Sequence, residues 1–344
     1  MRKNQELFIF GAGASYGART PRPRLGNLLH AYVQAFLHAK WSDLSYLEDG
    51  DGAVTYKNRQ ELDRILTHAT SFETLATKLI DQGRFPLLQK LNALMAFALT
   101  PPINDDPRVD NAFIEQPDYY DHFLSKKYPH NNDLKDTCFI TLNYDCLLER
   151  AICRHHRQQK LAGEDQCLCG HVDYRLNETS LGIEVLKPHG SINWVPDNAH
   201  DDGTIERNGP IPIVGTVWQG NTMEWKRIVA VDSPEGHEDI VVAHYAREKR
   251  AQANGDLLND IRALALLRVE CASSVTIIGI HIPASPSDDP FLQDLLTLLS
   301  RKVLDGLLVN FINPDRSELK VATSLGFQTK KKCFQEYVAE LPVG

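Results

Sequence analysis

A short apolar run that ends in two closely spaced glycines constrains this chain more than any other feature. Residues 7–10, Leu-Phe-Ile-Phe, pass without a polar break into Gly11-Ala12-Gly13-Ala14-Ser15. Such a run is typical of a buried parallel strand that enters a tight turn before a helix. Because glycine has no Cβ, this turn can bring its backbone against a pyrophosphate, which the helix start also favours. The pattern predicts a nucleotide site at the strand's carboxyl end, although a lone G-x-G also fits an ordinary turn.

The composition narrows the class of protein. The 344 residues suffice for one large domain or two ordinary ones, and 42% hydrophobic residues can form a substantial core. A net charge of −8 implies no general affinity for nucleic acid. No apolar run has the length of a membrane span and no signal-peptide pattern is present, so we expect a cytoplasmic protein without a membrane partner. Seven scattered cysteines favour reduced thiols over a disulfide framework.

The chain after the glycine turn differs from a dehydrogenase. A dehydrogenase-like fold needs a second apolar strand within about 30 residues and an acidic residue for the ribose. Instead, an arginine- and proline-rich loop at residues 19–24 leads into apolar residues at helical spacing. The arginines of this loop either face phosphates or lie on a solvated surface. Helical patterns continue until the sheet resumes at Thr137, so we predict a helical insertion over residues 25–135.

A second strand brings polar residues to the same predicted edge of the sheet. A largely apolar strand pattern, Cys-Phe-Ile-Thr-Leu at residues 138–142, is followed by Asn143-Tyr144-Asp145 and then by a helical pattern. Ligands of open α/β sheets bind at the carboxyl ends of the strands, so we expect Asn143 close to the glycine turn. Asn143 also suits a turn, and Asp145 is equally well explained as the N-cap of the next helix.

The segment over residues 153–255 is predicted as loops and short strands that line the pocket. Its first part contains Cys153, His155, His156, Cys167, Cys169 and His171. Because these residues form no paired C-x-x-C knuckles, we expect no metal.

Further along, a short strand at Val185 and Leu186 precedes His189-Gly190-Ser191. A histidine at a strand end either acts as an acid or base or is structural. Short hairpin strands are expected at residues 211–218 and 240–243.

Two more strands complete the predicted sheet. A helix over residues 256–271 precedes an apolar strand that ends at Gly279. The acidic Asp288-Asp289 leads to a helix over residues 291–303, and the strand that follows ends at Asn313. Asn313 is therefore a candidate contact for a ribose or an adenine.

In their order along the chain, these motifs resemble the sirtuin-like (SIR2-like) family, specifically its prokaryotic antiviral-defence branch. The matching segments are GAGAS at 11–15, TLNYD at 141–145, KPHGSINW at 187–194, IIGIHIP at 277–283 with Asp288 or Asp289, and INP at 312–314. The resemblance implies a single SIR2-like α/β domain over residues 1–344. Its fold would be a Rossmann-like parallel sheet of sirtuin type with the helical insertion after the first strand.

The resemblance also implies roles for individual residues. Asn143 would position a water beside the nicotinamide ribose of NAD, and His189 would be the catalytic histidine. The implied contacts to NAD, the substrate, are Gly11, Ala12, Gly13, Ala14, Ser15, Asp145, Gly190, Ser191, Gly279, Asp289 and Asn313. No metal is implied, since nicotinamide leaves as a neutral base.

Departures from the family pattern bear on the activity. Deacylase sirtuins carry a Gly-Ile-Pro-x-Phe-Arg segment and two C-x-x-C zinc knuckles, which this sequence lacks. Because the zinc module helps to build the acyl-lysine cleft, protein deacylation is disfavoured. Ile280-His281 stands where the family commonly has Tyr-Ser. The implied activity is hydrolysis of NAD to nicotinamide and ADP-ribose, as in the defence branch; the alternative is a catalytically weak module that binds NAD or ADP-ribose.

An unrestrained NAD hydrolase would poison its own cell. We therefore expect a poorly active homo-oligomer that a separate partner protein switches on, an ATPase or a nucleic-acid sensor as in related defence systems. Residues 25–98 of the helical insertion are the candidate contact surface, because they lie outside the nucleotide fold and carry many apolar positions.

Overall fold

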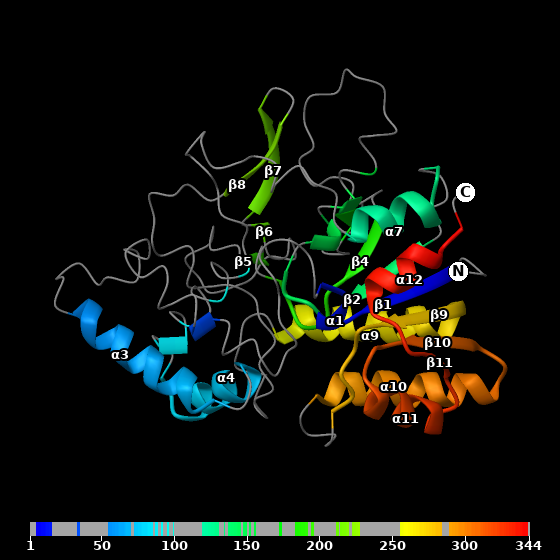
Figure 1. Ribbon diagram of the computed structural model, residues 1–344. Helices are drawn as coiled ribbons and strands as arrows, with labels where there is room; N and C mark the ends of the chain where they lie inside the picture. Colours follow the sequence, from blue (N-terminus) through cyan, green and yellow to red (C-terminus); the bar gives the residue numbers. More distant parts are fainter. Residues whose placement is uncertain are drawn as a thin grey trace.

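The fold is built on an all-parallel β-sheet (Figure 1). This computed structural model describes residues 5–15, 33–34, 54–69, 72–84, 87–88, 91, 95, 99, 119–130, 134, 137–145, 147–149, 151–152, 155, 172–173, 183–191, 194–195, 211–212, 214–219, 222–227, 255–283 and 289–342. The sheet strands are β1 (Gln5–Phe10), β2 (Thr137–Thr141), β3 (Val172–Asp173), β4 (Ile183–Leu186), β9 (Ala272–Ile278), β10 (Leu308–Ile312) and β11 (Gln328–Lys330).

The strand order is that of a Rossmann-like sheet. Among the described residues the seven strands lie in the order β11-β10-β9-β1-β2-β4-β3, and each neighbouring pair is parallel. Without the two-residue edge strand β3, this is the doubly wound order 3-2-1-4-5-6. The α/β class with a parallel sheet, predicted from the sequence, is confirmed.

The core surrounds β1, which pairs with β2 on one side and β9 on the other. Its residues 7–10 are almost fully buried, as expected for a strand with neighbours on both edges and helices on both faces. Phe8 and Phe10 point to one face, where both rings pack edge-on against Phe123 of helix α7 (Tyr119–Lys127). Phe334 of α12 (Phe334–Glu340) completes this aromatic cluster.

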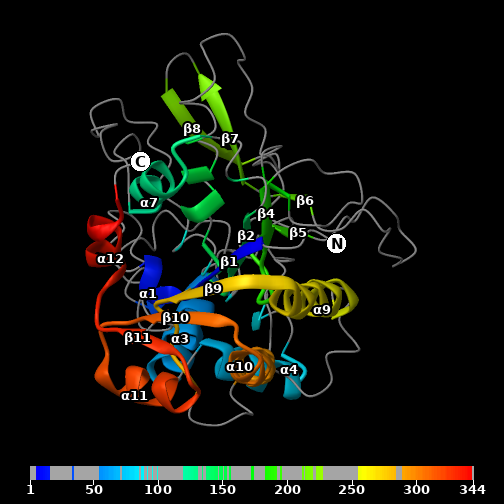
Figure 2. The ribbon, with the colours of Figure 1, turned by 90° about the vertical axis from the view of Figure 1, so that its right-hand side faces the viewer.

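Helices cover both faces of the sheet. Figure 2 shows α7 and α12 on one side, with α9 (Gly255–Cys271) and α10 (Pro290–Leu304) on the other. The other described helices are α1 (Ala12–Ser15), α3 (Val54–Thr67), α4 (Phe72–Asp81) and α11 (Arg316–Ser324). No described helix is long and apolar enough to cross a membrane.

Two segments outside the main sheet match parts of the sequence analysis. Helices α3, α4 and α7 lie between β1 and β2 in the sequence, within the predicted helical insertion, of which the structure describes only the residues given above. Two antiparallel hairpins pair β5 (Trp194–Val195) with β6 (Ile211–Pro212) and β7 (Val214–Gln219) with β8 (Thr222–Arg227), which confirms the predicted strands at 211–218. The strand expected at 240–243 lies outside the described residues.

Candidate functional site

The site predicted from the sequence lies at the switch point of the sheet. From β1 the chain continues to β2 on one side, and β9 later occupies the other side. Phe10, the last residue of β1, is level with Thr141 at the end of β2 and with Ile278 at the end of β9. The segments that follow these strands therefore meet at one edge, which is where open α/β sheets bind ligands.

The glycine turn is packed directly against the end of β9. Gly11 N–H donates to Ile278 O and Gly13 N–H donates to Gly279 O, both at 2.9 Å. A Cβ on Gly11 would lie 2.6 Å from Gly279 O, and one on Gly13 would lie 2.8 Å from Gly279 Cα. Backbone packing thus requires both glycines. Because Ala14 N–H also donates, to Gly11 O, three of the amides expected to face a phosphate already have partners within the protein.

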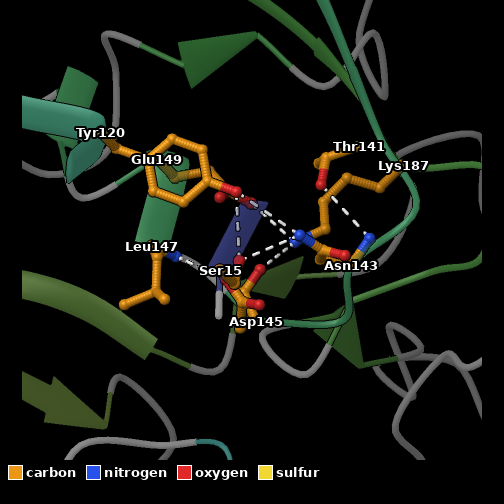
Figure 3. Close-up of polar contacts among 8 residues, drawn as sticks. All are labelled: Ser15, Tyr120, Thr141, Asn143, Asp145, Leu147, Glu149 and Lys187. Atoms are coloured by element: carbon orange, nitrogen blue, oxygen red, sulfur yellow. Dashed lines mark hydrogen bonds and ion pairs between the residues drawn. The ribbon is translucent and has the colours of Figure 1, made fainter. Parts of the chain in front are cut away.

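Asn143 is held by its amide nitrogen, as Figure 3 shows. Its Nδ2 lies 3.1 Å from Gly11 O, 3.0 Å from Ser15 Oγ and 3.4 Å from Tyr120 OH, all acceptors of its N–H groups. The side chain is buried, and its Oδ1 has no hydrogen-bond partner among the described residues. Buried amide oxygens are nearly always paired, so this oxygen is an open acceptor at the sheet edge.

Tyr120 is a site residue that the sequence analysis missed. It comes from α7, in the predicted insertion, and is 1% exposed. Its hydroxyl lies 3.1 Å from Ser15 Oγ and joins the contacts of Asn143 (Figure 3). No local pattern identifies it, because Tyr120 and Ser15 are 105 positions apart and the helix pattern around Tyr120 is that of a core residue.

Asp145 caps the helical residues that follow it, which was one of the two explanations left open by the sequence. Its Oδ1 accepts a hydrogen bond from Leu147 N–H at 3.0 Å. Burial raises the pKa of the Asp145 carboxyl, and the nearby charge of Lys187 partly opposes this shift. The second oxygen, Oδ2, has no hydrogen-bond partner among the described residues. Asp145 therefore caps the helix, and a hydrogen bond from the Ser15 hydroxyl is a further, smaller influence that lowers its pKa.

His189 is paired with Asp289, two residues that the sequence analysis proposed separately. His189 Nε2 lies 3.2 Å from Asp289 Oδ2, and both side chains are largely buried. Asp289 is also the N-cap of α10, since its Oδ1 accepts from Leu292 N–H. The preceding strand β4 ends at Leu186, and Gly190 adopts φ +87° in the turn that carries the histidine. The α10 N-terminus thus fixes the carboxylate that orients His189.

Asn313 lies at the predicted edge with both ends of its amide bound to the backbone. Nδ2 donates to Ile280 O at 2.7 Å, and Oδ1 accepts from Asp315 N–H at 2.9 Å. Asn313 therefore ties the end of β10 to the segment that follows β9. Glu318 of α11 fastens the same segment by accepting from Ile282 N–H. The contact of Asn313 with a ribose or adenine stays a prediction.

The described residues contain no group of three or more His, Cys, Asp or Glu residues that could hold a metal. Of the six Cys and His residues in the polar segment after residue 152, only His155 belongs to the described part. Burial lowers the pKa of His155. Ser191, another predicted contact, is fully buried behind the His189 turn.

No protein-family model and no curated protein matches the chain.

Proposed function

We propose that this chain is a SIR2-like NAD+ hydrolase that cleaves the bond between nicotinamide and ribose. The products are nicotinamide and ADP-ribose, and the role is depletion of NAD in prokaryotic anti-phage defence. The observation that carries the proposal is the buried Oδ1 of Asn143, which has no hydrogen-bond partner among the residues that the structure describes, at the switch point of a Rossmann-like parallel sheet. His189, on the turn after the neighbouring strand β4, and its partner Asp289, at the start of α10, supply a second chemical group at the same edge.

Asn143 suits the task of holding the attacking water. Cleavage leaves a cation-like ribose, so the enzyme must present a water to the face opposite the departing nicotinamide. An amide oxygen that accepts one proton of this water fixes its position without becoming charged. Gly11 O can only accept a hydrogen bond, so it fixes Nδ2 on its side of the amide and makes Oδ1 the atom presented.

His189 suits the removal of a proton from this water or from a ribose hydroxyl. When Nε2–H faces the Asp289 carboxylate, Nδ1 is the ring nitrogen that carries the lone pair. The carboxylate thus selects the tautomer of the imidazole, as in other paired histidines. The glycine turn gives weaker support, because the N–H groups of Gly13 and Ala14 already donate within the protein.

The test is to incubate the purified chain with NAD and measure nicotinamide and ADP-ribose. His189→Ala should lower turnover by about 10²- to 10⁴-fold and Asn143→Ala by about 10²- to 10³-fold. Asn143→Ala also removes the buried hydrogen bonds of Nδ2 and should cost about 1–3 kcal/mol of stability, so turnover is compared at temperatures where both variants are folded. His122→Ala is the matched control, because His122 is exposed on α7 and should leave turnover unchanged. Wild-type turnover in both site variants would refute the assignment. Binding of NAD without cleavage, with or without the product of a neighbouring gene, would favour the binding module.

Control of the proposed activity is part of the same proposal. We infer a poorly active homo-oligomer that a partner protein, an ATPase or a nucleic-acid sensor, switches on. Tyr120 supports a link between the helical insertion and the site, since its hydroxyl contacts Asn143 from α7. Light scattering combined with the NAD assay tests the inference. A fully active monomer would refute it, and an oligomer that survives deletion of residues 25–98 would move the interface elsewhere.

A further inference from the structure

We propose that Lys187 is a positioning residue that holds the turn carrying Asn143 against the turn carrying His189. The inference rests on the proposed function only for its catalytic consequence. The structural part concerns two turns on neighbouring strands, β2 and β4, which are far apart in the sequence.

Both ends of Lys187 make the contacts that this role needs. Its ammonium donates to Asp145 O at 2.5 Å and to Glu149 Oε1 at 2.8 Å, across 42 and 38 positions of sequence (Figure 3). Its own carbonyl accepts from Gly190 N–H at 2.9 Å, which closes the turn around His189. The same residue therefore fixes the backbone two residues after Asn143 and the backbone around His189.

Stability alone gives no reason for a lysine at this position. The Lys187 side chain is 0% exposed and its ion-pair partner Glu149 only 4% exposed, so both charges have lost their hydration. A buried ion pair is often no more stabilising than apolar side chains of the same volume. An apolar side chain, however, offers no N–H group to the Asp145 carbonyl, and this bond is the one that joins the two turns.

Glu149 has a different part in this arrangement. It neutralises the ammonium through Oε1 and lies on the helical residues after Asp145 instead of on either turn. Replacing Glu149 by glutamine keeps an oxygen for the ammonium and leaves the bond from Lys187 to Asp145 O in place. Glu149→Gln is therefore the matched control for a loss of charge pairing without a loss of the link between the turns.

The experiment compares Lys187→Met, the double variant Lys187→Met/Glu149→Leu and Glu149→Gln with the wild type. The double variant removes both charges together, so it should fold even if the single methionine variant does not. Amide hydrogen exchange reports on each turn without any need for activity. The probes are Leu147 N–H, bound to Asp145 Oδ1, and Gly190 N–H, bound to Lys187 O. Leu307 N–H, bound to Lys302 O beyond α10, is the distant reference.

We expect both turn probes to exchange roughly tenfold faster or more in the double variant, with the reference unchanged. Turnover of NAD should fall about 10²-fold with little change in KM, because misplaced groups lose rate more than ground-state binding. Glu149→Gln leaves the buried ammonium without its counter-charge, so overall stability should fall and all three probes should exchange faster together. The exchange of the two turn probes relative to the reference should stay at its wild-type ratio, and most of the turnover should remain.

Several outcomes would overturn the inference. Wild-type exchange at both turns in the folded double variant would show that Lys187 does not join them, and unchanged turnover would show that the link does not serve the site. A double variant that cannot fold would make Lys187 a requirement of folding. If the wild type cleaves no NAD, the proposed function fails, whereas amide exchange still decides whether Lys187 joins the turns.

Discussion

Replacing Gly279 by alanine tests whether the glycine turn and the end of β9 are locked together by backbone contact. Gly279 has φ +66°, and a Cβ at this position would lie 2.4 Å from Ala14 N and 2.5 Å from Gly13 C. Both neighbours are backbone atoms of the turn, so no side-chain rotation can make room. The turn itself must move, and the hydrogen bond from Gly13 N–H to Gly279 O must lengthen or break.

The expected loss of stability has three contributions. Positive φ costs a non-glycine residue about 1–2 kcal/mol. The lost backbone hydrogen bond costs about 1 kcal/mol, and overpacking against a rigid neighbour costs about 1–3 kcal/mol. Gly279→Ala should therefore destabilise the fold by about 4 kcal/mol, a large share of the stability of a typical domain.

Two other glycines isolate the packing contribution. Gly306 (φ +96°) and Gly83 (φ +65°) also have positive φ, but a Cβ on either would have no atom within 4 Å. Alanine at these positions should cost only about 1–2 kcal/mol. Urea unfolding followed by circular dichroism, with midpoints compared at unchanged m-value, measures all three variants. If Gly279→Ala is no less stable than the two controls, the close contact is not rigid and the reasoning fails.

Three further predictions concern single side chains near the site and in the core. Tyr120→Phe removes the hydroxyl that contacts Ser15 and Asn143, so the free energy of unfolding should fall by about 1 kcal/mol and NAD turnover should fall with KM unchanged. Urea unfolding and steady-state kinetics measure these effects, and unchanged turnover would contradict the prediction. Burial raises the pKa of Asp145 above its ordinary value of 3.8, so the folded chain binds more protons than the unfolded chain between the unfolded and the folded pKa. Stability should therefore fall as pH rises through that interval. Asp145→Asn should remove this fall, as urea unfolding midpoints from about pH 4 to about pH 7 would show. Burial raises the pKa of Tyr337 from 10.0 to about 12, so its contribution to stability should disappear as pH rises through that range. In Tyr337→Phe the urea unfolding midpoint should therefore decrease less over the same pH range than in the wild type.

Phosphate contacts at the glycine turn need a test other than bulky substitution. A valine at Gly11 or Gly13 would meet the backbone of Gly279 or Ile280 before it met any ligand. Loss of NAD binding in such variants would therefore accompany loss of structure. Binding measured at a fixed folded fraction, after unfolding curves have been recorded for each variant, separates the two effects.

The central strands could be predicted from the sequence because their pattern is local. A strand buried on both faces favours apolar residues at every position; residues 7–10 meet this requirement, and residues 275–278 meet it except at Thr276. The C-terminal elements α11, β11 and α12 were not predicted. Strand β11 is the three-residue sequence Gln-Thr-Lys at the sheet edge, where two of its side chains are exposed. An exposed edge strand of this length has no apolar pattern to identify it.

The sequence by itself determined which residues stand at the strand ends. The alternation of apolar runs with turns places Asn143, His189 and Gly279 just beyond their strands, and covalent order then brings them to one edge of a parallel sheet. Hydrophobic burial is non-directional and largely a property of each segment, so this level of structure can be predicted without knowledge of the partners.

Only the tertiary structure decided which atoms of these residues have hydrogen-bond partners within the protein. A hydrogen bond between separate elements depends on the angle at which the donor meets the acceptor and on tenths of an ångström in the distance between them. Tyr120 reaches Asn143 from α7, Lys187 reaches the Asp145 carbonyl from the end of β4, and Asp289 reaches His189 from the start of α10. The contact with Tyr120 helps to orient the Asn143 amide, whose Oδ1 has no hydrogen-bond partner among the described residues, and no pattern in the sequence could show this.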